Sequence, residues 1–242
     1  MILSVAQTKP FKGNVAANLA AHITLAALAA GNGAGVVMFP ELSITGYEPG
    51  LAAQLATSMH DTRYNLLQQL ADARNITICA GMPIAAAGGV MIGLLVFTPH
   101  APGQLYCKQH LHKDELPYFI PGTKQLLLPA GKYTIGLAIC YEIAVNAHAA
   151  ALFNNGANVY MASVAKSVTG MQKAAEMLAA TARTYNTPVL VSNCVGHCDN
   201  FNCGGASAVW DGSGTLLAQL GAGEEGIIVY NLSSNTAAAH LV

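Results

Sequence analysis

Charged residues are scarce in this chain. Of its 242 residues only 12 are acidic and 11 basic, which makes 10% charged and a net charge of −1, whereas about a quarter of the residues in an ordinary soluble domain are charged. The sequence has no cluster of basic residues that could bind the phosphate groups of a nucleic acid. We therefore expect no nucleic-acid partner. The neutral, alanine-rich composition instead favours contact between subunits.

We also expect neither a membrane span nor a signal peptide from this sequence. Its most apolar long run, residues 15–30, contains Asn18 and His22 and is shorter than the roughly 20 residues that a bilayer requires. Met1 leads directly into Ile2–Ala6 without a basic region or a cleavage-site pattern, which indicates a first strand. We expect a cytoplasmic protein with no membrane contact, whose six cysteines stay reduced.

Strand and helix patterns alternate along the chain, which predicts an α/β protein with mixed strand pairing. The predicted strands are 2–7, 36–39, 76–82, 90–97, 104–110, 133–140, 158–162, 188–193, 207–210, 215–220 and 226–231. The predicted helices are 15–30, capped by Asn14, 62–74, with Leu66, Leu67 and Leu70 inward, 143–155 and 171–185. No repeat, linker or charge block marks a boundary, so residues 1–242 are expected to form one domain.

Three predicted strands end beside a side chain that can carry out chemistry. Glu41 follows the strand in VVMFPE, Lys108 lies in LYCKQHL, and Cys140 ends IGLAIC. Active sites gather at strand ends in α/β proteins, because the rigid sheet directs the residues there into one crevice. Each residue also has an explanation that involves no chemistry. Glu41 could be a solvated turn residue, Lys108 a charged residue on an edge strand, and Cys140 a packed thiol in the core.

Taken together and in this order, these segments resemble the nitrilase superfamily of carbon–nitrogen hydrolases. The resemblance is carried by Phe39-Pro40-Glu41-Leu42 with Thr45-Gly46-Tyr47, Tyr106-Cys107-Lys108-Gln109-His110-Leu111, Glu115 with Phe119 and Pro121-Gly122, and Ile139-Cys140-Tyr141-Glu142. It covers nearly the whole chain and implies a four-layer α-β-β-α sandwich. It also implies a Glu41, Lys108 and Cys140 triad, no cofactor, and a homodimer or higher homo-oligomer packed through helices.

The chemistry of such a triad follows from its residue types. A thiol with an ordinary pKa of about 8.5 is mostly protonated at neutral pH and needs activation. Glu41 can accept its proton, and Lys108 and the backbone N–H of Tyr141 can stabilise the oxyanion that forms when Cys140 attacks an amide carbonyl. The expected partner is a small linear amide, cleaved through a thioester. Hydrolysis of an N-carbamoyl compound and acyl transfer stay open, as does a non-catalytic small-molecule binding protein.

Further residues are assigned from the same resemblance. Glu115 is expected to position the lysine and the substrate, and Tyr47, Tyr141, Asn193 and Phe201 are expected at the pocket. A tyrosine at position 141, where nitrilases usually have tryptophan, favours amides over nitriles. The arginine that often follows the Cys-Tyr-Glu step in family amidases is missing, so recognition of a substrate carboxylate through it is not expected. For Glu142 we expect a structural hydrogen bond or ion pair.

The segment NCVGHCDNFNC (193–203) could be interpreted as a metal site, since Cys194, Cys198 and Cys203 accompany His197 and Asp199. The spacing Cys-x3-Cys-x4-Cys lacks the tight Cys-x2-Cys pair of zinc sites, and no second pair follows. We therefore predict a loop at the edge of the pocket and no metal. A disulfide between Cys198 and Cys203 stays open.

Overall fold

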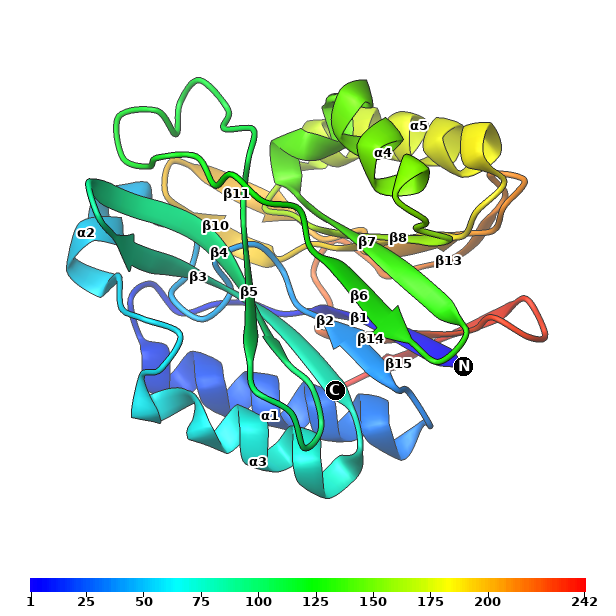
Figure 1. Ribbon diagram of the computed structural model, residues 1–242, viewed down its shortest axis with the longest axis horizontal. Coiled ribbons are helices and arrows are strands. Elements are labelled where there is room, and N and C mark those ends of the chain that lie inside the picture. The colour runs from blue at the N-terminus through cyan, green and yellow to red at the C-terminus, as the bar shows by residue number, and fades with distance from the viewer.

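The computed structural model describes residues 1–242 and shows two β-sheets packed face to face between two pairs of helices (Figure 1). The α-helices are α1 (Val15–Gly31), α2 (Ala52–Leu55), α3 (Asn65–Arg74), α4 (Asn146–Asn154) and α5 (Val168–Tyr185). Helices α1 and α3 cover the outer face of one sheet, and α4 and α5 cover that of the other. The predicted four-layer α-β-β-α sandwich is thereby confirmed. None of the helices is long and apolar enough to cross a membrane.

Both sheets have parallel strands at their centre and antiparallel strands at their edges. The first sheet runs in the order β15 (Thr236–Leu241), β14 (Gly226–Asn231), β1 (Ile2–Gln7), β2 (Val36–Met38), β3 (Thr77–Ala86), β4 (Gly89–Phe97) and β5 (Gln104–Cys107). The second runs in the order β13 (Leu216–Gln219), β12 (Ala208–Trp210), β9 (Val189–Ser192), β8 (Val159–Ser163), β7 (Tyr133–Ile139) and β6 (Leu127–Ala130). A separate hairpin pairs β10 (Val195–Cys198) with β11 (Phe201–Gly204).

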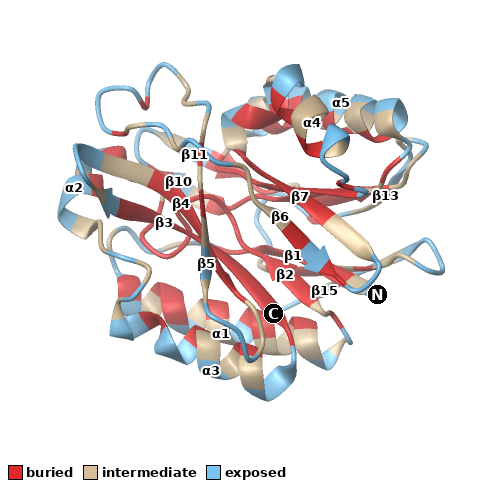
Figure 2. Ribbon diagram, viewed as in Figure 1, coloured by how far each residue is buried: buried red, intermediate tan, exposed pale blue.

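Apolar side chains fill all three spaces between the four layers. Most strand segments in the interior are accordingly coloured as buried in Figure 2. Between the sheets, Val5 of β1 and Met161 of β8 belong to one core and are fully buried. The small side chains of Ala26 and Ala29 let α1 pack closely on its sheet. Burial on this scale is the main stabilising term of the fold.

Hydrogen bonds join the two sheets where the central parallel strands end. The Ser163 hydroxyl, at the end of β8, donates to the Phe39 carbonyl just after β2 at 2.8 Å. The Glu41 backbone N–H donates to the Val164 carbonyl at 3.3 Å. The residues that follow β2 and β8 are therefore held at one common edge, although the strands belong to different sheets.

The structure corrects several predicted elements. The predicted strands 76–82 and 90–97 come closer together along the chain than expected, because β3 continues to Ala86 and β4 begins at Gly89. The predicted helix 143–155 is divided into a 3-10 turn (Cys140–Ala144) and α4. Leu66, predicted to face inward, is 52% exposed, and only Leu67 of that group is fully buried.

Four strands were not predicted: β6, β10, β11 and β15. Their sequences explain this. Strand β15 reads TAAAHL, and the hairpin strands read VGHC and FNCG. Alanine, glycine and asparagine are depleted in strands, and these segments contain few of the β-branched residues that usually indicate a strand. Pairing with neighbours determines these strands. Every residue of β15, for example, has a partner on β14.

Candidate active site

Lys108 lies at the centre of the candidate site and contacts two carboxylates. It directly follows β5, its side chain is fully buried, and its ammonium donates to Glu41 Oε1 and to Glu115 Oε1, both at 2.7 Å. Burial lowers the pKa of Lys108, but the negative groups around it, with Glu41 the strongest of them, together outweigh burial and raise the net pKa. The lysine is therefore a permanent cation with one of its three N–H donors still available.

Glu41 is placed by a tight loop after β2. This loop packs so closely on β3 that a side chain at Gly81 would overlap the backbone of Pro40 and Leu42. Glu41 is 1% exposed, and its Oε2 has no hydrogen-bond partner. Burial raises its pKa to about 7, although the ammonium of Lys108 acts in the opposite direction. A carboxyl group with this pKa can both accept and donate a proton near neutrality.

Cys140 lies where β7 gives way to the 3-10 turn. Its backbone is in the left-handed region, with φ of +45°, which costs a non-glycine residue about 1–2 kcal/mol. The Sγ lies 3.9 Å from the Ala165 carbonyl oxygen. Burial and the charge of Glu41 raise the pKa of Cys140 to about 11, although Lys166 and Lys108 lower it. The resting thiol is therefore protonated and requires a base.

Glu115 connects the lysine to the cavity wall. Its Oε1 accepts hydrogen bonds from Lys108 and from the Tyr47 hydroxyl at 3.0 Å, and its Oε2 accepts one from the His112 backbone N–H at 2.7 Å. The carboxylate is 1% exposed. It thus fixes the direction of the Lys108 ammonium and orients the Tyr47 ring.

Glu142 joins the segment after β5 to the segment that carries Cys140. It is fully buried. Its oxygens accept hydrogen bonds from the Tyr106 hydroxyl at 2.7 Å and from the backbone N–H groups of Gln109 at 2.5 Å and Ile139 at 2.7 Å. His148 Nε2 lies 3.6 Å away. Glu142 therefore makes structural hydrogen bonds, which hold the neighbours of Lys108 and Cys140 together.

A cavity of about 630 Å³ opens beside these residues. Its lining includes Cys140, Glu115, Tyr47, Tyr141 and Phe201. The aromatic side chains of Tyr47, Tyr141 and Phe201 therefore line the same cavity as Cys140 and Glu115, whereas Glu41 and Lys108 do not belong to the lining.

Asn193, the remaining residue predicted at the pocket, is fully buried and does not belong to this lining. Its amide oxygen accepts a hydrogen bond from the Lys166 backbone N–H at 2.9 Å, and its amide nitrogen donates to the Lys166 carbonyl at 3.0 Å. Asn193 therefore fixes the segment behind the cavity wall.

Lys166 lines the cavity and was missed in the sequence. It follows β8 after two residues, so the same strand-end pattern that identified Glu41 would have found it. It forms no ion pair with an acidic side chain. Its charge is one of the two cationic influences that lower the pKa of Cys140.

Comparison with known proteins identifies the family. A sequence profile of the family described as carbon-nitrogen hydrolase matches residues 2–240. The chain therefore belongs to the carbon–nitrogen hydrolase family, as the motifs around Glu41, Lys108 and Cys140 predict.

Two curated proteins show moderate sequence similarity. An (R)-stereoselective amidase from Pseudomonas sp. is 28% identical over 160 residues, which cover 66% of this chain and 58% of that protein. A glutamine-dependent NAD(+) synthetase from Thermotoga maritima is 28% identical over 242 residues, which cover 95% of this chain and 42% of that protein. The chain thus spans about half the length of these relatives.

Solved structures of an amidase from Nesterenkonia sp. AN1 share the fold. One, a mutant with acrylamide added at the active-site cysteine, superposes with a TM-score of 0.88 at 23% identity and covers 97% of this chain and 94% of that one. Another, a mutant in complex with butyramide, gives the same TM-score and identity, with coverages of 97% and 92%. The likeness extends over nearly all of both chains, which confirms the fold.

Proposed function

We propose that this protein hydrolyses the C–N bond of a small linear amide, with Cys140 as nucleophile, Glu41 as general base and acid, and Lys108 as the stabilising cation. The observation that carries the proposal is the buried Lys108 ammonium, which contacts Glu41 and Glu115 at 2.7 Å each beside a cysteine that opens into a cavity.

The first step is attack on the amide carbonyl. Glu41 accepts the thiol proton while Cys140 Sγ forms a bond to the carbonyl carbon, because a thiol whose pKa is raised to about 11 does not ionise by itself near neutrality. The carbonyl oxygen becomes an oxyanion. The unused N–H of Lys108 and the backbone N–H of Tyr141 are the proposed donors to it, and losing one such donor costs about a hundredfold or more in rate.

In the remaining steps Glu41 first donates the proton that it accepted and then accepts a proton from water. Protonated Glu41 gives its proton to the departing nitrogen, so that ammonia or an amine leaves and the acyl group stays on Cys140 as a thioester. Glu41, ionised again, then removes a proton from water, which attacks the thioester and releases the acid. A single group with a pKa of about 7 suits both directions of proton transfer.

The substrate class is supported by the relatives and by the cavity. The Nesterenkonia amidase has been captured with acrylamide and with butyramide, which are small uncharged amides. The aromatic rings of Tyr47, Tyr141 and Phe201 offer an apolar wall that suits a short acyl chain. Hydrolysis of N-carbamoyl substrates and acyl transfer to an amine would use the same thioester chemistry. Measuring turnover of different substrates distinguishes these activities from amide hydrolysis.

The test is ammonia release from a panel that contains butyramide, acrylamide, glutamine, a carbamoyl amino acid and a nitrile. We expect turnover of the simple amides, and a loss of about 10⁴-fold or more in Cys140→Ala, since a nucleophile has been removed. Cys107→Ala is the matched control, because this half-buried thiol lies outside the cavity lining. Equal turnover by Cys140→Ala would refute the assignment, and no turnover of any compound would favour a binding protein.

A further inference from the structure

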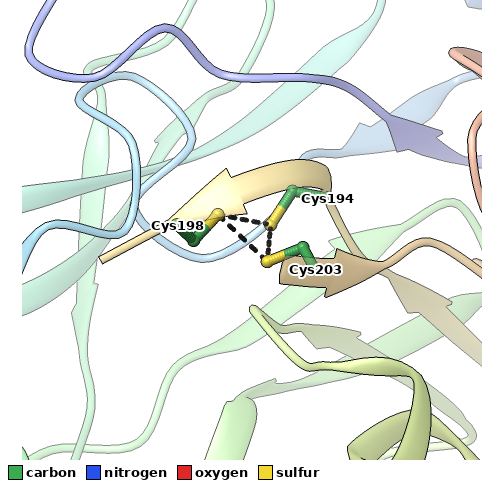
Figure 3. A group of neighbouring side chains, drawn as sticks. All are labelled: Cys194, Cys198 and Cys203. Carbon is green, nitrogen blue, oxygen red and sulfur yellow. Dashed lines mark hydrogen bonds between the residues drawn. The ribbon is translucent and has the colours of Figure 1, made fainter. Parts of the chain in front are cut away.

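Three cysteines outside the proposed triad converge at a single point, as Figure 3 shows. Cys194 directly precedes β10, Cys198 ends β10, and Cys203 lies on β11. Their sulfur atoms are separated by 2.8 Å (Cys194 to Cys203), 3.0 Å (Cys198 to Cys203) and 3.7 Å (Cys194 to Cys198). The side chains are almost completely buried, and no disulfide joins them.

Two of these separations are shorter than the roughly 3.5–4.0 Å at which unbonded heavy atoms usually rest. The Cys194 thiol donates a hydrogen bond to Cys203 Sγ, and the Cys203 thiol donates one to Cys198 Sγ. The three sulfurs are therefore already gathered by a chain of hydrogen bonds. A thiophilic cation would bind the three residues as thiolates, because the thiolate is the ligand form of cysteine.

The dimensions of the triangle suit a metal ion. A point equidistant from the three sulfurs lies about 1.9 Å from each, against a zinc–thiolate bond of about 2.3 Å. An ion in the sulfur plane therefore requires each sulfur to move outward by only about 0.4 Å. This is a small rotation of three side chains on one hairpin.

The number of donors selects among metals. No histidine, aspartate or glutamate joins the three cysteines, and the surrounding side chains are Ala165, Tyr47 and Phe201. Structural zinc sites are almost always four-coordinate, whereas soft thiolate ligands select Cu(I), an ion that accepts three-coordination. We propose that Cys194, Cys198 and Cys203 form a three-coordinate thiolate site for Cu(I). On binding, the ion replaces the thiol protons, which pass to solvent, and no electron is transferred.

The site lies directly behind one wall of the active-site cavity. The turn between β10 and β11 contributes Asp199 and Asn200 to the cavity lining, and the first residue of β11 contributes Phe201. The Tyr47 backbone donates to Cys198, while its hydroxyl donates to Glu115. A bound ion would thus hold the base of the hairpin and fix the wall that faces the reactive thiol.

The test is a Cu(I) titration of fully reduced protein under anaerobic conditions, in competition with a coloured Cu(I) chelator. It uses the Cys140→Ala variant, so that the active-site thiol cannot contribute and the outcome does not depend on the proposed hydrolysis. We expect one Cu(I) per chain, lost when Cys203→Ser is added and kept when Cys107→Ser is added as the matched control. Zn(II) is expected to bind much more weakly, because it lacks a fourth ligand.

A second measurement identifies the ligands of the ion directly and does not require the Cys203→Ser variant to fold. X-ray absorption of the Cu(I)-loaded Cys140→Ala protein should show three sulfur neighbours in the first coordination shell. Nitrogen or oxygen neighbours, or only two sulfurs, would overturn the proposal. It would also fail if the reduced protein took up no Cu(I), if Cys203→Ser left uptake unchanged in a folded variant, or if Zn(II) bound as tightly as Cu(I).

Discussion

Replacing Glu41 with glutamine should raise stability while abolishing activity. The wild-type carboxylate is 1% exposed, one of its oxygens has no hydrogen-bond partner, and it shares the single Lys108 ammonium with Glu115. Its pKa accordingly rises from 4.5 to about 7. A shift of this size corresponds to about 3 kcal/mol in the free energy of unfolding.

The sign of the effect follows from linkage. The folded-state pKa is raised, so the contribution of this group to stability is fully present below pH 4.5 and is lost as the pH rises through about 7. Glutamine resembles the protonated acid at every pH. We therefore expect Glu41→Gln to match the wild type below pH 4.5 and to exceed it at pH 8 by up to about 3 kcal/mol, less what the new amide N–H groups cost if unpaired.

The assay is urea unfolding of both proteins at pH 4.5 and pH 8, with ammonia release measured on the same samples. Glu176→Gln is the matched control, because this exposed carboxylate on α5 forms no ion pair; it should change stability by less than about 0.5 kcal/mol. The reasoning is refuted if the advantage of Glu41→Gln is equal at the two pH values, or if the variant is less stable at pH 8.

Three further outcomes are expected. The kcat/KM for an amide should fall as the pH drops below about 7, because Glu41 must be ionised to accept the thiol proton; a flat profile from pH 5 to 8 would contradict this. Glu142→Gln should lower the unfolding free energy by about 2 kcal/mol, since its oxygens accept bonds from Tyr106, Gln109 and Ile139; an unchanged denaturation midpoint would argue against it. The family resemblance predicts a homodimer or a higher homo-oligomer, so light scattering should give at least twice the chain mass of 25.0 kDa, and a monomer mass would exclude it.

The positions of the candidate residues on strand ends could be predicted from the sequence, but their pairing could not. Glu41, Lys108 and Cys140 each follow an apolar run that is visible in the sequence. Which carboxylates contact the lysine depends on how the loops after β2 and β5 of one sheet fold against each other. The position of Cys140 depends on how the second sheet meets this edge, which is fixed by contacts such as Ser163 to Phe39. No local pattern encodes such a contact between distant segments.

The cysteine cluster shows a second limit. Spacing rules for zinc sites assume a tight turn between paired ligands, whereas here a hairpin aligns Gly196 with Cys203 and Cys198 with Phe201. The glycines and asparagine in these strands have weak strand propensity, so the hairpin was not predicted. Without the hairpin register, the spacing of the cysteines says little about their distance in space.

Trapping the acyl-enzyme is the decisive measurement. Protein mixed with butyramide is quenched in acid within a fraction of a turnover, digested and analysed by mass spectrometry. The expected result is a butyryl group on the peptide that contains Cys140, and none on the corresponding peptide of Cys140→Ala. An acyl group on another residue, or undiminished ammonia release from Cys140→Ala, would contradict the assignment of Cys140 as the nucleophile.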